Sequence, residues 1–321
     1  MPVANIFEHK SGNKISSLSN FKMKNIILVF LFLPFFSCKV LHKSTANLNK
    51  VNWIKGSEIC EKNRDPLIQI ERFNYNTYIL RQNKCVNYEA PFMFLFLGNK
   101  KALLMDTGAT EDENKFPLEK TVSQIIKDWE KATHNQIELI VAHTHNHGDH
   151  KAGDEQFKNR PATTMVGLEA DEVAAFFQLN NWPLQNNQID LGNRVLDIIP
   201  LPGHEKASVA VYDRQTKLLL SGDSFYPGRL YIRDWSAFQL SIQRLVNFTE
   251  HHKVSYILGN HIEMSNIPGK DYPTGTTFQP EEHALPLTVA QLRLLNNELK
   301  NMGTLPALKI LDDVIIYPVK G

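Results

Sequence analysis

Short apolar runs alternate with segments of helical periodicity along most of the chain. Apolar residues at helical spacing predict helices over 117–132, 169–179, 234–252 and 287–302, with Pro117 at a first helical position and Asp234 as an N-cap. Apolar runs bounded by Asn, Gly and Lys predict strands over 77–82, 92–98, 101–108, 137–142, 194–201, 207–213, 217–223, 254–260 and 313–318. The helices come between groups of strands, which favours sheets covered by helices over a regular eight-unit barrel.

The first 55 residues follow a different pattern. Lys24 precedes the apolar run 26–36, and Ser37 and Cys38 follow it. This order is typical of a secretory signal, and the run is too short for a membrane-spanning helix. A cysteine at this point resembles the lipidation box of bacterial lipoproteins, although the box usually has small residues where Phe35 and Phe36 stand. The alternatives are an uncleaved anchor and a plain signal with a coincidental cysteine.

The N-terminal pattern predicts three parts. Residues 1–37 are an upstream segment and signal peptide, with translation starting at Met1 or Met23, and residues 38–55 are a lipoprotein tether. Residues 56–321 form one large folded domain. The predicted location is therefore outside the cytoplasm (periplasmic or on the outer face), on a membrane to which lipidated Cys38 attaches the chain.

Charge and cysteine content narrow the functional classes. The 35 basic and 34 acidic side chains form no basic run, which argues against a nucleic-acid partner. Once Cys38 is set aside, Cys60 and Cys85 remain. In an exported protein such a pair suggests a disulfide, and the alternative is two unrelated buried thiols.

Five of the predicted strands end at an aspartate or a histidine. The residues concerned are Asp106, the histidine cluster that begins after 137–142, His204, Asp223 and His261. Strand ends hold side chains rigidly while the loops beyond them leave space for a ligand. Five such junctions in one chain predict a single convergent site.

The histidine cluster has the composition of a metal site. Four of the chain's twelve histidines lie between His143 and His150, and imidazole and carboxylate are ligands that zinc prefers. In extended backbone His145 and His147 point the same way and can hold one ion. Asp149 and His150, which follow a glycine, can turn toward a second ion. Each ion still needs ligands from the other strand ends, where a carboxylate could bridge the two.

The run from His145 to His150 resembles the HxHxDH signature of the metallo-β-lactamase superfamily. Asp106, His204, Asp223 and His261 match the remaining family motifs in the expected order, and the resemblance covers roughly residues 68–265. It implies a mixed α/β (α+β) fold, a four-layer αββα sandwich with a dinuclear metal site at one edge of the two sheets. The folded domain would then be catalytic.

The resemblance also assigns roles to individual residues. It implies two zinc ions, or two similar divalent ions, with Asp223 between them. Asp106 resembles an aspartate that supports the site without binding metal. The implied ligands are His145, His147 and His204 for the first ion, Asp149, His150 and His261 for the second, and the shared Asp223.

The same residues predict a hydrolase that acts on a small molecule. Two zinc ions can lower the pKa of a bound water to about 7, and the resulting hydroxide attacks a carbonyl carbon while Asp149 orients it. Zinc β-lactamases usually have Cys or Ser where Asp223 stands, so this chain resembles the glyoxalase-II-like and lactonase branches. Esters, lactones and thioesters therefore rank above β-lactams. His147 stands where flavodiiron proteins have glutamate, which argues against di-iron chemistry.

Tyr226 follows Asp223 by three residues, where related lactonases have a tyrosine that donates a hydrogen bond to the substrate carbonyl. We predict this catalytic role for Tyr226, with a packed aromatic residue as the alternative. The loop-like segment 265–286 is expected to cover the mouth of the site and shape the pocket. Only one helix and one strand follow it, which argues against a glutathione thioesterase with its helical C-terminal region.

Three other functions compete with ester hydrolysis. A metallo-β-lactamase would open β-lactam amides with the same ligands. A non-catalytic zinc-binding lipoprotein would use the histidines for storage, although such proteins tend to have mobile histidine-rich tracts. A nuclease of the same superfamily is opposed by the neutral charge and the exported location.

Overall fold

The computed structural model describes residues 45–319, and the predicted signal peptide and Cys38 lie outside the described residues. The described residues form one compact unit. The helices are α1 (Leu118–Thr133), α2 (Gly148–Lys151), α3 (Ala170–Phe176), α4 (Trp235–His251) and α5 (Val289–Met302). The strands are β1 (Ile68–Asn74), β2 (Thr77–Gln82), β3 (Phe92–Leu97), β4 (Lys101–Met105), β5 (Glu138–Ala142), β6 (Thr163–Met165), β7 (Asn187–Asp190), β8 (Val195–Pro200), β9 (Val209–Asp213), β10 (Leu218–Gly222), β11 (Arg229–Ile232), β12 (Tyr256–Gly259), β13 (Pro286–Leu287), β14 (Lys309–Ile310) and β15 (Ile315–Pro318).

The strands form two sheets of six and one of three. The first sheet has the order β1-β2-β3-β4-β5-β6, the second β13-β12-β10-β9-β8-β7 and the third β11-β15-β14. β4 and β5 are parallel, as are β10 and β12. Because the carboxyl ends of parallel strands meet at one edge of a sheet, the residues that follow β4 and β5 come together, as do those that follow β10 and β12.

Alternating side chains give the first sheet two buried faces. Phe94 and Phe96 of β3 join the core between the two large sheets, which also contains Ile198 of β8. Leu95 and Leu97, which point the other way, pack in a separate core with α1. Every residue of β3 is therefore buried, as its unbroken apolar run predicts.

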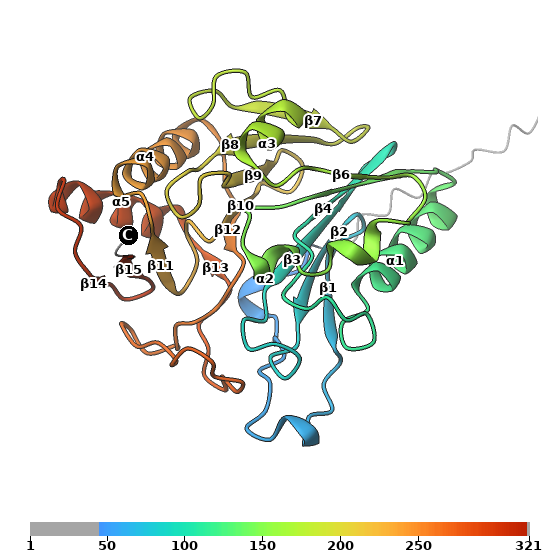
Figure 1. Cartoon of the computed structure of the whole chain (residues 1–321), viewed down its shortest axis with the longest axis horizontal. Coiled ribbons are helices and arrows are strands. Elements are labelled where there is room, and N and C mark those ends of the chain that lie inside the picture. Colours follow the sequence, from blue (N-terminus) through green and yellow to red (C-terminus); the bar gives the residue numbers. More distant parts are fainter. Residues whose placement is uncertain (1–44, 320–321) are drawn as a thin grey trace, which may run out of the picture. The chain divides into compact units, whose positions relative to one another are not determined.

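The second sheet repeats this arrangement. Val209 and Val211 of β9 face the core between the sheets, whereas Ala210 and Tyr212 belong to the core that contains α4 and α5. In Figure 1 α1 lies outside one sheet, and α4 and α5 lie outside the other. The layers are therefore helix, sheet, sheet and helix, which confirms the predicted αββα sandwich.

The predicted bounds of the strongly periodic segments lie close to the bounds in the structure. As predicted, Asp234 is the N-cap of α4, where its side chain accepts a hydrogen bond from Ala237 N. Pro117 is the N-cap of α1, one residue before the position predicted for it. The sequence missed six strands, which are short, lie at sheet edges or carry polar residues. They are β1, β6, β7, β11, β13 and β14.

The predicted start of the domain at residue 56 is too late. Leu48 and Trp53 are buried in the core between the sheets, and the Trp53 ring packs edge-on against Phe92 at a centroid distance of 4.9 Å. The later part of the predicted tether, 38–55, is therefore part of the fold, because two large apolar side chains anchor it there.

Of the two alternatives for the cysteines, the structure has the disulfide. Cys60 and Cys85 are bonded, with their Cα atoms 5.1 Å apart. Within residues 45–319, no helix combines the length and the apolar character needed to cross a membrane.

Candidate metal centre

The seven predicted ligands converge from both large sheets. His145, His147, Asp149 and His150 lie on the loop and short helix α2 after β5. The other three come from the second sheet, where His204 follows β8, Asp223 follows β10 and His261 follows β12. They form two groups, His145 with His147 and His204, and Asp149 with His150, Asp223 and His261, and within each group the ligand atoms lie within 4.8 Å of one another.

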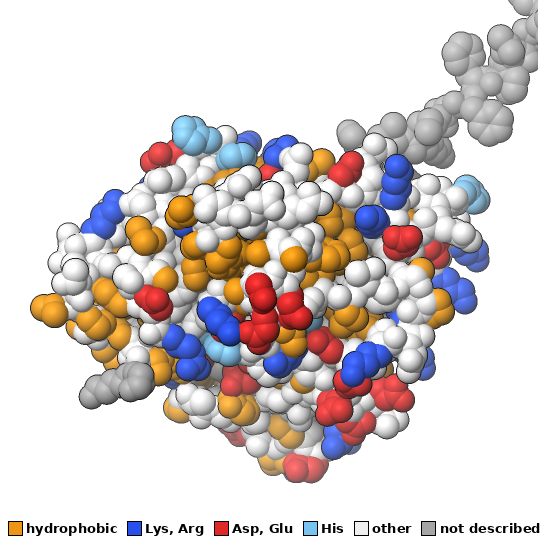
Figure 2. All heavy atoms as spheres, turned by 45° about the horizontal axis from the view of Figure 1, so that its top comes forward, with side chains coloured by type: hydrophobic (Ala, Val, Ile, Leu, Met, Phe, Trp, Pro, Cys, Tyr) orange, Lys and Arg blue, Asp and Glu red, His pale blue; other side chains and the backbone are white. Residues whose placement is uncertain are grey.

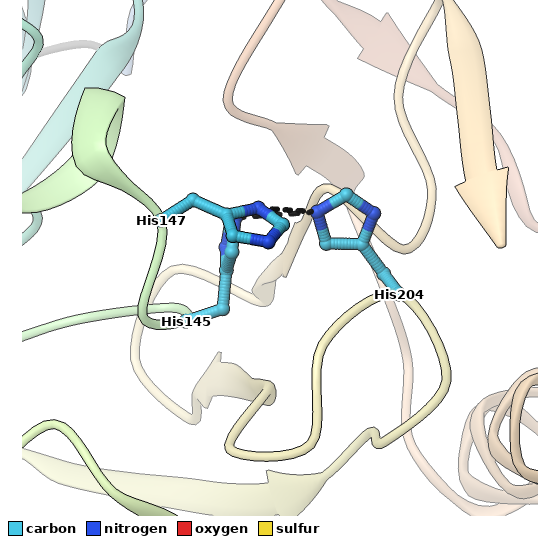
Figure 3. A group of neighbouring side chains, drawn as sticks. All are labelled: His145, His147 and His204. Atoms are coloured by element: carbon cyan, nitrogen blue, oxygen red, sulfur yellow. Dashed lines mark hydrogen bonds between the residues drawn. The ribbon is translucent and has the colours of Figure 1, made fainter. Parts of the chain in front are cut away.

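The first group consists of three imidazoles that face one another (Figure 3). His204 Nε2 lies 3.3 Å from His145 Nε2 and 3.0 Å from His147 Nδ1. His204 Nδ1 donates to the carbonyl oxygen of Tyr231 at 2.8 Å, so its proton is on Nδ1 and its Nε2 presents a lone pair. Burial lowers the pKa of His204 to about 4, which keeps the ring neutral. A lone pair that faces other ring nitrogens at this distance fits a bound cation.

The second group combines two imidazoles with two carboxylates. His261 Nδ1 donates to the carbonyl oxygen of Glu89 at 3.0 Å, and its Nε2 faces His150 Nε2 at 3.2 Å. Asp149 Oδ2 is 3.4 Å from His150 Nε2 and 3.3 Å from His261 Nε2. This set of two nitrogens with carboxylate oxygens is one that zinc accepts.

Asp223 lies between the two groups. Its Oδ2 is 3.8 Å from His204 Nε2 and 3.9 Å from His145 Nε2, and it is 3.5 Å from Nε2 of both His150 and His261. Its other oxygen, Oδ1, is buried and has no hydrogen-bond partner among the described residues. One oxygen aimed at both groups and one buried oxygen without a partner fit a carboxylate that bridges two cations.

The two groups differ in their affinity for protons. Burial and the neighbouring imidazoles hold the pKa of His145 well below its ordinary value. His150 and His261 are also buried, but Asp223 and Asp149 overcome the effect of burial and raise the pKa of His261 to about 9. Burial alone would raise the pKa of Asp149, yet His150 and His261 lower it below the ordinary range. A divalent cation in the second group would therefore displace protons.

Asp106 is fully buried next to the second group, and both of its carboxylate oxygens accept hydrogen bonds. Its Oδ1 accepts a hydrogen bond from Thr144 N at 2.8 Å, and its Oδ2 accepts one from Asn260 Nδ2 at 2.6 Å. Asp106 Oδ2 also lies 3.5 Å from His150 Nδ1. The aspartate thus joins the ends of β4, β5 and β12 beneath the ligands. Asn260 was not singled out from the sequence, although it directly precedes His261.

His143 has a polar partner that the sequence did not reveal. Its Nε2 lies 2.9 Å from Asp154 Oδ1, which also accepts a hydrogen bond from Thr107 Oγ1 at 2.7 Å. Thr107 N in turn donates to the carbonyl oxygen of His150 at 2.7 Å. His143 therefore belongs to a network behind the ligands and is absent from both ligand groups.

The structure places Tyr226 against the site with its hydroxyl group directed elsewhere. The hydroxyl donates to the carbonyl oxygen of Arg229 at 2.5 Å and lies 3.2 Å from Glu263 Oε2. The ring packs edge-on to His261 with centroids 5.7 Å apart. Because a hydroxyl has one proton to donate, this geometry favours the packed alternative over the donor role predicted from the sequence.

A cavity of about 270 Å³ opens over the two groups. Its lining adds side chains that the sequence did not identify, among them exposed Arg233 and Thr274, a residue of the predicted covering segment 265–286. Ligands and polar residues make up the whole lining, which comprises Glu89, His147, Asp149, His204, Asp223, Tyr226, Tyr231, Arg233, His261, Glu263 and Thr274.

Figure 2 shows basic and acidic side chains interspersed on one face of the molecule, without a continuous basic surface there.

The described residues of the chain match the family model "Metallo-beta-lactamase superfamily" over 89–255, which is more than half of the sequence. The chain belongs to this superfamily, whose enzymes are hydrolases. The family and its predicted fold are thereby confirmed.

Curated relatives include proteins named acyl-coenzyme A thioesterase and hydroxyacylglutathione hydrolase. The chain is 25% identical to the acyl-coenzyme A thioesterase MBLAC2 of Gallus gallus over 166 residues, which is 39% of this chain and 57% of that protein. It is 26% identical to the Homo sapiens protein of the same name over 205 residues, 53% of this chain and 72% of that one. It is 24% identical to a hydroxyacylglutathione hydrolase of Rhizobium meliloti (strain 1021) over 152 residues, 46% of this chain and 56% of the relative.

Among solved structures, a metallo-beta-lactamase from Pontibacter korlensis superposes with a TM-score of 0.48 at 18% identity. The match covers 73% of this chain and 99% of that one.

Proposed function

We propose that this protein is a dinuclear zinc-dependent hydrolase that cleaves an ester-type bond, in an ester, lactone or thioester, of a small molecule. The observation that carries the proposal is the position of Asp223, whose Oδ2 faces both ligand groups at 3.5–3.9 Å. The names of the curated relatives, an acyl-coenzyme A thioesterase and a hydroxyacylglutathione hydrolase, support the ester-type class.

Divalent ions held by the seven ligands would polarise a substrate carbonyl and lower the pKa of water toward 7. The protein contributes ligands held in place by buried hydrogen bonds, among them His204, whose lowered pKa keeps it neutral. Burial opposes ionisation of Asp223, but His261 and His150 hold its pKa at about 2, so it is a carboxylate at neutral pH. Asp149 lines the cavity with a partly exposed side chain, where it can accept a hydrogen bond from water and orient it.

The cavity wall also contains groups suited to holding a polar substrate. Arg233 is exposed at the cavity and makes no ion pair with any described carboxylate within 4.0 Å. Its guanidinium group is therefore free to bind an anionic part of a substrate. Tyr231 and Thr274 add hydroxyl groups on the same wall. A lining of this composition favours a small polar substrate.

The proposal is tested by metal analysis of the purified protein, followed by turnover of a panel of esters, lactones, thioesters and β-lactams. We expect close to two equivalents of zinc or a similar ion, and faster turnover of ester-type carbonyls than of β-lactam amides. Asp223→Asn should lower the metal content and reduce turnover at least a hundredfold. Asp197→Asn is the matched control, because Asp197 pairs with Arg214 on the second sheet, away from the ligands.

Three results would overturn parts of this proposal. Folded protein that binds no divalent metal would refute the metal-dependent hydrolase. Efficient opening of β-lactams without turnover of esters, lactones or thioesters would favour the alternative metallo-β-lactamase. Full metal occupancy without turnover of any substrate on the panel would favour the non-catalytic zinc-binding alternative.

We also propose that the protein works outside the cytoplasm, on a membrane to which acylated Cys38 attaches it. The disulfide between Cys60 and Cys85 supports this location, because such bonds persist in oxidising compartments.

A further inference from the structure

The two cation groups differ in what orients their histidines. In the first group, the Nδ1 proton of His204 is held by the carbonyl oxygen of Tyr231, a residue of strand β11. β11 pairs with β15 over its full length, so this carbonyl is fixed by a sheet. In the second group, the Nδ1 proton of His261 is held by Glu89, which lies in the irregular segment between β2 and β3.

That segment, residues 83–91, has no sheet partner and is held by other means. Cys85 is bonded to Cys60, which ties the segment to the short 3-10 helix Cys60–Lys62. Asn83 anchors its start by donating from Nδ2 to the carbonyl oxygen of Pro66 at 3.0 Å and by accepting from Cys85 N at 2.8 Å. These contacts fix the half of the segment that precedes Glu89.

Asn87 holds the half that contains Glu89. Its Nδ2 donates to the carbonyl oxygen of Ala109 at 2.8 Å, which anchors it to the loop after β4. Its Oδ1 accepts a hydrogen bond from Glu89 N at 3.0 Å. The peptide that presents the Glu89 carbonyl to His261 is also held through its own N–H, because Ala90 N donates to the carbonyl oxygen of Asn87 at 3.1 Å. Asn87 therefore contacts this turn through both its side chain and its backbone, and the disulfide lies four residues upstream of Glu89.

We propose that the Cys60–Cys85 disulfide and Asn87 are positioning elements for His261, and that they hold the second cation group in its binding geometry without acting on the first. The inference rests on the proposed metal-dependent function. It concerns ligand orientation, because the ring nitrogen opposite a metal-binding nitrogen fixes the tautomer and the direction of the ring. The backbone of His261 has separate support, since Asn260 bonds to Phe92 through both its side-chain amide and its carbonyl oxygen.

The consequence is a selective loss of one ion. Without a fixed Glu89 carbonyl, His261 can take either tautomer, and only the form with its proton on Nδ1 presents a lone pair from Nε2 to Asp149 and Asp223. Loss of such an outer partner typically weakens metal affinity about 10- to 100-fold. The first group keeps its Tyr231 contact and should keep its affinity.

The experiment compares the wild type with Asn87→Ala, the double variant Cys60→Ser/Cys85→Ser, and Asn187→Ala as the matched control. Asn187 also donates from its amide to a backbone carbonyl, that of Phe177 at 2.9 Å, but it lies on edge strand β7, which is followed by no ligand. Zinc-loaded protein is titrated with a chelator, and bound zinc per chain is measured. We expect Asn87→Ala and the double variant to lose their more weakly held ion at about tenfold lower chelator concentration, with the other ion unchanged.

A second readout needs no metal. In histidine-labelled, metal-free protein at a pH where His261 is neutral, ¹⁵N chemical shifts report the tautomer of each ring. We expect one tautomer of His261 in the wild type and in Asn187→Ala, and a mixture in the two test variants. His204 should keep a single tautomer in all four proteins.

The outcomes separate this inference from the proposed function. If the wild type binds no metal, the proposed function fails and the tautomer measurement still decides the positioning role. Equal weakening of both ions, or an Asn187→Ala variant that behaves like Asn87→Ala, would overturn the inference. Should the double cysteine variant fail to fold, Asn87→Ala carries the test, and unchanged retention of both ions together with an unchanged His261 tautomer in that variant would refute it.

Discussion

Individual buried side chains in this protein have protonation states that depend on how many carboxylates lie nearby and how close they are: Asp223 Oδ2 is 3.8 Å from His204 Nε2, whereas His261 Nε2 has Asp149 at 3.3 Å and Asp223 at 3.5 Å. His204 and His145 are buried among other imidazoles, and their pKa values fall. His261 is equally buried but lies beside Asp149 and Asp223, and its pKa rises to about 9. The same desolvation therefore gives opposite results in two neighbouring groups, because the charge of the nearest neighbours decides the sign.

Lys84 shows the effect of burial without a close acidic partner. Its side chain is buried, its Nζ donates to the carbonyl oxygen of Tyr88 at 3.2 Å, and it forms no ion pair within 4.0 Å with a described carboxylate. Burial and the nearby Arg81 lower its pKa to about 7, and the more distant Glu282, Glu263 and Glu89 offset part of this shift. The folded protein therefore binds fewer protons than the unfolded chain between pH 7 and the ordinary lysine pKa.

This depressed pKa predicts how stability changes with pH in Lys84→Met. In the wild type, Lys84 should make stability rise with pH above about 7, by at most about 1.4 kcal/mol per pH unit. Lys84→Met lacks this contribution, so its advantage in stability over the wild type should be largest at and below about pH 7 and should disappear toward pH 10. Urea unfolding at several pH values measures the difference. Parallel curves for the two proteins would mean that Lys84 titrates normally.

At the scale of elements, the candidate metal centre lies where strands end and loops begin. β10 and β12 are parallel, so Asp223 and His261 leave the second sheet at the same edge. β11 follows after the connection that contains Tyr226, whose hydroxyl reaches the carbonyl oxygen of Arg229 at the start of that strand. Tyr226 therefore fixes the beginning of β11, the strand that supplies the carbonyl for His204.

Tyr226→Phe should consequently affect stability more than chemistry. The substitution leaves the carbonyl of Arg229 without its donor, and a lost buried hydrogen bond costs about 1–3 kcal/mol. Turnover of the best ester-type substrate should fall less than about twofold, against the ~10²–10³ loss typical of a removed oxyanion donor. Urea unfolding and steady-state kinetics measure the two effects.

Tyr212→Phe is the matched control for this prediction. Tyr212 is also buried and donates to a backbone carbonyl, that of Lys253 at 2.7 Å, but it packs with α4 outside the second sheet. Both variants should lose comparable stability and keep turnover. A tenfold loss of turnover in Tyr226→Phe alone, at unchanged stability, would restore the catalytic role predicted from the sequence.

At the scale of the whole molecule, buried polar contacts join the two sheets at a distance from the site. Arg194 is buried beside the second sheet, where it forms an ion pair with Asp213 at 2.7 Å. Its Nη1 also donates to the carbonyl oxygen of Asn76, and its Nη2 donates to Thr77 Oγ1 of the first sheet. This residue helps to fix the two sheets relative to each other, on which the convergence of ligands from both depends.

The proposed location also belongs to this scale. Cys38→Ser should prevent acylation, so the protein should leave the membrane fraction or remain unprocessed. Fractionation and intact-mass measurement of the wild type and the variant provide the test. Unchanged membrane attachment of unprocessed Cys38→Ser protein would favour the simple anchor that the sequence left as an alternative.

The sequence by itself predicted the family and, through that resemblance, the layer order and the candidate ligand set. These depend on local patterns, namely runs of alternating or continuous apolar residues and the spacing from His145 to His150, and a short window of the chain contains each pattern. Asp106 and Asp223 could be recognised as candidate site residues from the sequence, because each is a polar residue at the end of an apolar run predicted to be a strand. The edge strands were missed, since β14, for example, is exposed and lacks that contrast.

Only the tertiary structure decided what surrounds the ligands. The carbonyl oxygen of Glu89 orients His261 from 172 residues away, and Asn260 reaches Asp106 across 154 residues. A backbone carbonyl has no signature in the sequence, and contacts over such distances arise only when sheets pair and loops pack. The direction of the Tyr226 hydroxyl, on which its predicted catalytic role depends, is set in the same way by where β11 begins. Residue type and spacing therefore specify which atoms can bind a cation, and the packed chain specifies how those atoms are held.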